Sequence, residues 1–259
     1  MEGLAMSNTM RGADIVARSL ERLGCRRIFT LSGNHIMSLF DATLETKIKL
    51  VHVRHEAAAV HMADGWGRLT GEPGVAMVTG GPGHANAIGA LFAALASESP
   101  MVLLSGHAAT RELGRGGFQE LRQAEIAEPV TKASWTAKST SGLAGDIGNA
   151  MRIARQGRPG PVHVSLPSDL LDEIVDVGSI AWPNGHDGPG ASILGSNAHR
   201  TLRSFLSTPF FPKPVLPRSN HWSGLAMRSH SHATGPAAGS RSPASPLSRC
   251  PTIPGPAEQ

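Results

Sequence analysis

Over the first 180 residues, apolar positions follow two alternating spacings. Ala13, Val16, Ala17 and Leu20 recur at the spacing of one helix face, and the helix that they predict ends at Gly24. Further helical patterns cover about 35–46, 55–69, 84–97 and 143–154. Short apolar runs bounded by turn residues predict buried strands at 28–31, 48–53, 74–79, 101–105 and 161–166.

The alternation of strand and helix predicts one α/β domain over about 8–182. Right-handed crossovers between such units produce a doubly wound, mostly parallel sheet of the flavodoxin-like type, with helices on both faces. Sheets of this type bind ligands at the carboxyl ends of their strands. We therefore expect the functional site in the loops at 32–35, 54–56, 79–86 and 106–119.

From about Asn184 onward, neither spacing continues. Residues 184–259 hold 11 Pro, 8 Gly and 12 Ser, and their apolar residues occur singly or in pairs. Such a segment cannot bury enough apolar surface to offset its ordering entropy. We expect a disordered tail, and the abrupt change after Pro183 is also typical of a shifted reading frame or a truncation.

The distribution of charge narrows the range of partners. The whole chain has a formal charge of +4 and a pI near 9.6. Residues 184–259 contain 7 basic and 2 acidic residues, so the positive excess belongs to the tail and not to the predicted domain. We expect no nucleic-acid partner.

Two cysteines far apart exclude a disulfide framework, and no secretion signal is visible at the N-terminus. The most apolar stretch, residues 85–106, is interrupted by Ser97-Glu98-Ser99-Pro100 and predicts a core helix followed by a core strand. These features favour a cytoplasmic protein without a membrane partner.

Two local motifs fail on inspection. His55 and His61 are six positions apart, whereas a zinc-binding helix needs histidines four apart, so we expect no metal ligands here. Gly81-Pro82-Gly83-His84-Ala85-Asn86 follows a strand and opens a helix, but Asn86 replaces the third glycine of a dinucleotide fingerprint.

Glu56 lies just after a predicted strand, at the beginning of a helix rich in alanine. Small apolar neighbours would leave the carboxylate with little polar company and favour its protonated form. The alternative is that Glu56 only interacts favourably with the helix dipole. Local physics alone leaves both interpretations open.

A resemblance covers about residues 10–182. Val53-Arg54-His55-Glu56-Ala57-Ala58-Ala59 and Ala63-Asp64-Gly65-Trp66-Gly67-Arg68-Leu69-Thr70-Gly71 resemble the N-terminal pyrimidine-binding domain of thiamine-diphosphate enzymes, above all of acetolactate synthase large subunits. The similarity continues, in family order, through Thr79-Gly80-Gly81-Pro82-Gly83, Gly117-Phe118-Gln119-Glu120 and Gly157-Arg158-Pro159-Gly160-Pro161-Val162.

The resemblance implies a cofactor and roles for particular residues. It implies that Glu56 hydrogen-bonds N1′ of the aminopyrimidine of thiamine diphosphate, and it makes Glu56 and Gln119 the candidate catalytic residues. It also implies a cofactor-binding set that lies against the pyrimidine, made of Gly33, Glu56, Gly81, Pro82, Gly83 and Asn86. Phe118 and Gln119 are placed on the side of a small 2-oxo acid substrate.

Departures from the family pattern concern the substrate. Ser32-Gly33-Asn34-His35 stands where acetolactate synthases commonly have Pro-Gly-Gly, and Trp66 stands in place of a tyrosine. The acceptor therefore stays open, and a lyase or decarboxylase of 2-oxo or 2-hydroxyacyl compounds is an alternative to a carboligating transferase.

No Gly-Asp-Gly occurs in the chain, although the family binds Mg²⁺ and the diphosphate through that motif in a separate domain. We therefore expect the chain to hold only the pyrimidine half of the cofactor. Three interpretations follow: a truncated protein inactive alone, one subunit of a split enzyme, or a non-catalytic module that pairs with a full-length homologue. The partner would be a second copy, a chain that carries the diphosphate domain, or that homologue.

Overall fold

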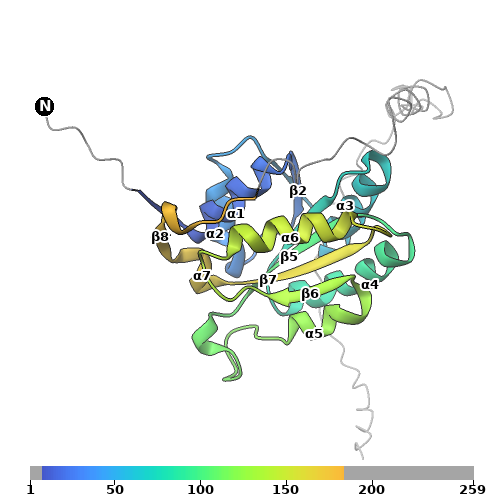
Figure 1. The fold of residues 1–259 in the computed structure, drawn as a ribbon. Helices are drawn as coiled ribbons and strands as arrows, with labels where there is room; N and C mark the ends of the chain where they lie inside the picture. Colours follow the sequence, from blue (N-terminus) through green and yellow to red (C-terminus); the bar gives the residue numbers. More distant parts are fainter. Residues whose placement is uncertain (1–7, 184–259) are drawn as a thin grey trace, which may run out of the picture. The chain divides into compact units, whose positions relative to one another are not determined.

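A computed structural model describes residues 8–183, and these residues form a three-layer α/β domain (Figure 1). Its central sheet has six parallel strands in the order β3-β2-β4-β5-β7-β6. The strands are β2 (Arg27–Thr30), β3 (Lys49–His52), β4 (Gly74–Val78), β5 (Met101–His107), β6 (Ala133–Thr136) and β7 (Pro161–Pro167).

Helices cover both faces of this sheet. One face carries α1 (Gly12–Arg22), α2 (Met37–Thr43) and α6 (Leu143–Arg155). The other face carries α3 (Glu56–Thr70), α4 (Pro82–Ala96) and α5 (Gln123–Ala127). The side chains of β4 alternate between the two cores, because Val75 and Met77 pack with the first set and Ala76 and Val78 with the second.

A small second sheet joins the two ends of the described domain. Strands β1 (Thr9–Arg11) and β8 (Ile174–Asp176) pair antiparallel, with Met10 opposite Val175. The short helix α7 (Ser168–Asp172) precedes β8 and packs against α1. The remaining short elements are the 3₁₀ turns η1 (Asn34–Ile36), η2 (Thr110–Glu112), η3 (Glu128–Val130) and η4 (Val177–Ser179).

The predicted α/β class and the mostly parallel sheet are confirmed. The long apolar runs were sufficient to predict the parallel strands, because a strand that is buried on both faces needs a continuous apolar sequence. The predicted helix at 35–46 is wrong in detail, since η1 and a shorter α2 replace it. The pattern also missed α5 and β6, both of which are short. The predicted tail, 184–259, lies outside the described residues.

The strand order places a topological switch point at the carboxyl ends of β2 and β4, where doubly wound sheets have their ligand-binding crevice. β2 lies between β3 and β4, so the chain leaves β2 in one direction and leaves β4 in the other. Loops that diverge in this way form the ligand-binding switch point of doubly wound sheets. The loops concerned follow Thr30 and Val78, and they contain Gly33 and Gly81. No helix among residues 8–183 is long and apolar enough to cross a bilayer.

Candidate functional site

Glu56 is the first residue of α3, immediately after the loop that follows β3. The preceding residue, His55, caps the helix, because its Nδ1 accepts a hydrogen bond of 3.2 Å from the backbone N–H of Ala57. This cap fixes where the helix begins and so directs the Glu56 side chain. Glu56 is only 9% exposed, which is unusual for a carboxylate.

A side chain from the neighbouring helix holds this carboxylate. Asn86 Nδ2, one turn into α4, donates a hydrogen bond of 3.0 Å to Glu56 Oε2. The other oxygen, Oε1, accepts no hydrogen bond from residues 8–183. The sequence predicted a carboxylate with few polar neighbours. In the structure, Asn86 is a polar neighbour of one of its two oxygens.

Two glycines pack tightly against Thr79 near the free oxygen. A Cβ added to Gly83 would lie 2.7 Å from Thr79 Cγ2 and 3.3 Å from Glu56 Oε1. A Cβ added to Gly33 would lie 2.4 Å from Thr79 Cβ. Both positions therefore exclude a side chain, and the backbones of two loops approach the same threonine next to the carboxylate. Glycine is the residue that allows backbones to approach this closely.

Gly81 opens the loop that leads into α4, and it has a positive φ of 59°. Its N–H donates a 2.8 Å hydrogen bond to Oε1 of Gln123, a buried side chain from α5. Gln123 Nε2 in turn donates to the Gly106 carbonyl at 3.0 Å and to Ser165 Oγ at 2.9 Å. The loop is thereby fixed to β5 and β7. Pro82 follows as the exposed first residue of α4.

Gln119 and Phe118 lie in the segment between η2 and α5 and contact residues of the two switch-point loops. Gln119 has a φ of 54°, which is uncommon for a residue other than glycine, and a Cβ on Gly81 would lie 2.5 Å from its carbonyl oxygen. Phe118 is 64% exposed, with its ring centroid 5.8 Å from that of His35. An exposed aromatic ring beside the crevice can contact a bound molecule.

His35 joins the two switch-point loops. Its ring Nδ1 lies 3.3 Å from Thr79 Oγ1, and its backbone N–H donates to the same oxygen at 3.4 Å. Burial lowers the pKa of His35. From the sequence, His35 stood out only as a departure from the family pattern, and nothing in the sequence showed that it contacts both Thr79 and Phe118.

A cluster of buried histidines lies behind the crevice, and the sequence pattern did not reveal it. His84 Nδ1 lies 2.9 Å from Ser105 Oγ, and the ring centroids of His84 and His163 are 4.6 Å apart. Burial lowers the pKa of His84 to about 4 and that of His163 well below its usual value. Both imidazoles are therefore neutral at pH 7 and act as packed polar groups.

Among the predicted residues, the structure places Asn86 and Gly83 against Glu56. Gly33 contacts Thr79, Gly81 contacts Gln119, and Phe118 lies beside His35. Within residues 8–183, no three His, Cys, Asp or Glu side chains are arranged to hold a metal ion.

Comparison with known proteins shows which family this part of the chain belongs to. Residues 10–126 match the family described as "Thiamine pyrophosphate enzyme, N-terminal TPP binding domain". This part of the chain is therefore such a domain.

The chain is, more narrowly, homologous to acetolactate synthase large subunits. It is 44% identical over 165 residues to the acetolactate synthase isozyme 3 large subunit of Escherichia coli. These aligned residues cover 63% of this chain and 29% of that protein. It is 35% identical over 181 residues to a probable acetolactate synthase large subunit of Methanocaldococcus jannaschii, covering 70% of this chain and 31% of the relative. With a probable acetolactate synthase of Mycobacterium bovis, the identity is 32% over 227 residues, covering 86% of this chain and 40% of that protein. The chain thus spans between three and four tenths of the length of these relatives.

Proposed function

We propose that this chain supplies the pyrimidine-binding half of a thiamine-diphosphate enzyme that decarboxylates or carboligates a small 2-oxo acid. One observation carries the proposal: a buried carboxylate, Glu56, is held through Oε2 by Asn86 while its Oε1 stays free beside Gly83. A buried carboxyl group with one oxygen that has no partner among the described residues can share a proton with a ring nitrogen.

The chain's own residues have distinct parts in this proposal. The Glu56 carboxyl group would hydrogen-bond N1′ of the aminopyrimidine through Oε1 and share a proton with that nitrogen, and Asn86 would keep the carboxyl group from rotating away. Gly33 and Gly83 would keep their loops packed on Thr79 beside the carboxyl group, and Gly81 and Pro82 would shape the loop that faces the ring. Phe118 and Gln119 exclude water on the substrate side. Thiamine diphosphate, when bound, supplies the group that accepts the electrons released by decarboxylation.

The diphosphate half of the site has to come from elsewhere. The 259 residues contain no Gly-Asp-Gly, so we propose that another polypeptide or domain binds the Mg²⁺ and the diphosphate. The chain alone would then be inactive, as a truncated enzyme would be. A split enzyme, and a module that pairs with a full-length homologue, are the alternatives that reconstitution separates.

The test is reconstitution with a separately produced diphosphate domain of an acetolactate synthase that carries Gly-Asp-Gly. We expect pyruvate consumption with the wild-type chain, and activity reduced by about 10²-fold or more with Glu56→Gln. Glu45→Gln is a control, because Glu45 is exposed on the loop after α2. Equal activity of the wild-type chain and Glu56→Gln would refute the proposal, as would equal activity of the partner without this chain. Mixing with a full-length homologue then shows whether heterodimers with altered activity form instead.

A further inference from the structure

A basic depression lies at the amino-terminal ends of β2 and β3, whereas Glu56 follows the carboxyl end of β3. It encloses about 470 Å³ and is lined by Glu21, Gly24, Cys25, Arg26, Arg27, Lys47 and Lys49. This volume is within the range of small-molecule sites in proteins, which is roughly 300–1,000 Å³. Neither the sequence motifs nor the proposed function accounts for this feature.

The basic side chains are forced close together by the sheet. Arg27 and Lys49 are register partners on the adjacent parallel strands β2 and β3, so their side chains leave the sheet on the same face. The backbone N–H of Lys49 donates to the Arg26 carbonyl at 3.0 Å, which brings Arg26 to the same edge. Like charges in such positions repel each other unless an anion lies between them.

The depression has four cations, and none of them pairs with a carboxylate within residues 8–183: Arg26, Arg27, Lys47 and Lys49. Two cations elsewhere in the domain do pair: half-buried Arg11 with Asp14 and Asp41, and exposed Arg158 with Glu98. The only carboxylate that lines the depression, that of Glu21, already accepts a 2.8 Å hydrogen bond from the backbone N–H of Lys47. The depression therefore has a large excess of unneutralised positive charge.

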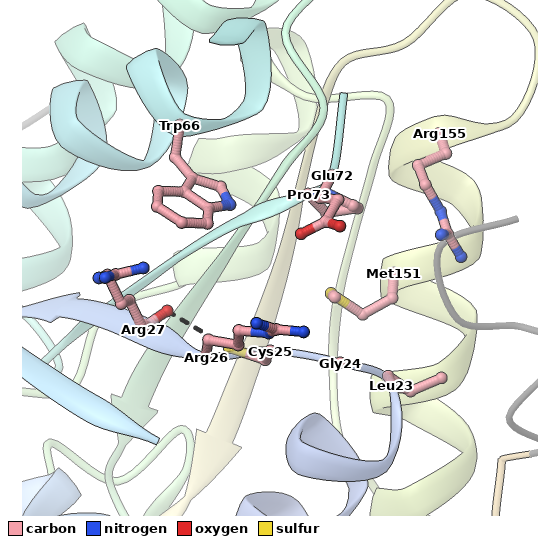
Figure 2. A pocket seen from close by; sticks show the side chains of 10 residues that line it. All are labelled: Leu23, Gly24, Cys25, Arg26, Arg27, Trp66, Glu72, Pro73, Met151 and Arg155. Carbon is pink, nitrogen blue, oxygen red and sulfur yellow. Dashed lines mark hydrogen bonds between the residues drawn. The ribbon is translucent and has the colours of Figure 1, made fainter. Parts of the chain in front are cut away.

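Arg27 is also held in place by an aromatic ring. Its guanidinium carbon lies 5.0 Å from the centroid of Trp66 on α3, and Figure 2 shows the two side chains next to a narrow crevice that Glu72 and Met151 also line. A guanidinium that stacks on a ring keeps its N–H groups available at the rim, where they can donate in pairs to an oxyanion.

We propose that this depression binds a small molecule through a diphosphate group. Guanidinium and ammonium groups form short, charge-assisted hydrogen bonds with phosphate oxygens. Two adjacent phosphates would also remove the repulsion between Arg27 and Lys49. The carboxyl-end crevice around Glu56 plays no part in this binding, so the proposal is independent of the proposed function.

The probes are inorganic pyrophosphate and ADP, titrated into the purified full chain by calorimetry at low salt. We expect saturable 1:1 binding that raises the thermal midpoint. Binding should weaken by about tenfold or more in Arg26→Gln/Lys49→Gln, because two charge-assisted contacts are lost. Arg115→Gln/Lys138→Gln removes the same two charges from exposed positions elsewhere and should change the affinity by less than about twofold.

Glu56→Gln should leave pyrophosphate binding unchanged, which separates this site from the cofactor crevice. Equal affinity for both probes identifies the diphosphate group itself as the ligand, and tighter binding of ADP identifies a nucleotide. The proposal is overturned if neither probe binds saturably, or if the two double variants weaken binding equally, which would show attraction by net charge only.

Discussion

Asn86 on α4 and Glu56 on α3 are joined by a 3.0 Å hydrogen bond that links the second turn of α4 to the first residue of α3, and both helices pack on the same face of the sheet. The other carboxylate oxygen, Oε1, has no partner among residues 8–183 and lies beside Gly83. This pair is the centre of the candidate site.

Replacing the amide by a second carboxylate tests that contact. Asn86→Asp places two negative charges about 3 Å apart, so the domain should lose about 1–3 kcal/mol of stability at pH 7 and less at pH 4. Denaturant unfolding at both pH values measures the effect. The control is Asn149→Asp, because Asn149 is exposed on α6 and contacts Arg152, which should tolerate the new charge. Equal losses in the two variants would show that Asn86 does not face Glu56.

Two glycines of one helix should respond in opposite ways to the same change. Gly83→Ala would drive a methyl group to 2.7 Å from Thr79, and we expect a loss of about 1–3 kcal/mol as the loop shifts. Gly89→Ala, in the same helix, meets nothing within 4 Å and should stabilise the domain by about 0.5–1 kcal/mol. Thermal unfolding compares them, and a stabilised Gly83→Ala would contradict the close approach of the loops.

We expect Gln123 to contribute more to the stability of the domain than its position in a polar stretch of sequence suggests. Gln123→Leu would leave the Gly81 N–H and the Ser165 hydroxyl without their partner, at a cost of about 1–3 kcal/mol for each buried group. Gln156→Leu, at an exposed position, should be close to neutral. Urea unfolding of both variants decides the point, and equal midpoints would mean that the loop does not depend on this side chain.

The buried histidines predict how stability changes with pH. Because burial lowers the pKa of His84 to about 4, the unfolded chain takes up a proton below its usual pKa of 6.5 while the folded chain does not. Stability from this residue is complete above pH 6.5 and is lost as the pH falls toward 4, by up to about 3 kcal/mol. His163 acts in the same direction.

Urea unfolding at intervals between pH 7 and pH 4.5 measures this loss. In His84→Asn the dependence on pH should be shallower, whereas in His61→Asn, at an exposed position of α3, it should match the wild type. A wild-type stability that is constant over the interval would be inconsistent with neutral, buried imidazoles.

The sequence predicted the strands of the sheet interior and the position of Glu56, because both depend on local order along the chain. Continuous apolar runs predict strands such as β4 and β5. A strand followed by a helix places Glu56, the first residue of that helix, near the carboxyl ends of the strands. The edge strand β6 escaped prediction because it is short and only half-buried, so its residues carry no clear period.

Contacts between distant segments could not be predicted from local pattern. The contact of Gly33 with Thr79 depends on β2 lying beside β4, and the histidine cluster depends on α4 covering β5 and β7. Gln123 lies in a polar stretch, so nothing nearby marks it as buried. Resemblance to known enzymes had indicated the candidate residues around Glu56, but not the partners that hold them.

The most direct test of the central claim is a titration of the isotope-labelled chain with thiamine diphosphate, followed residue by residue by NMR. The account predicts weak binding, with shifts confined to the loops around Gly33, Gly83 and Asn86 and abolished in Glu56→Gln. Shifts that occur elsewhere, or that persist in Glu56→Gln, would contradict a pyrimidine site at Glu56. Tight binding by the chain alone would contradict the claim that it holds only half of the cofactor.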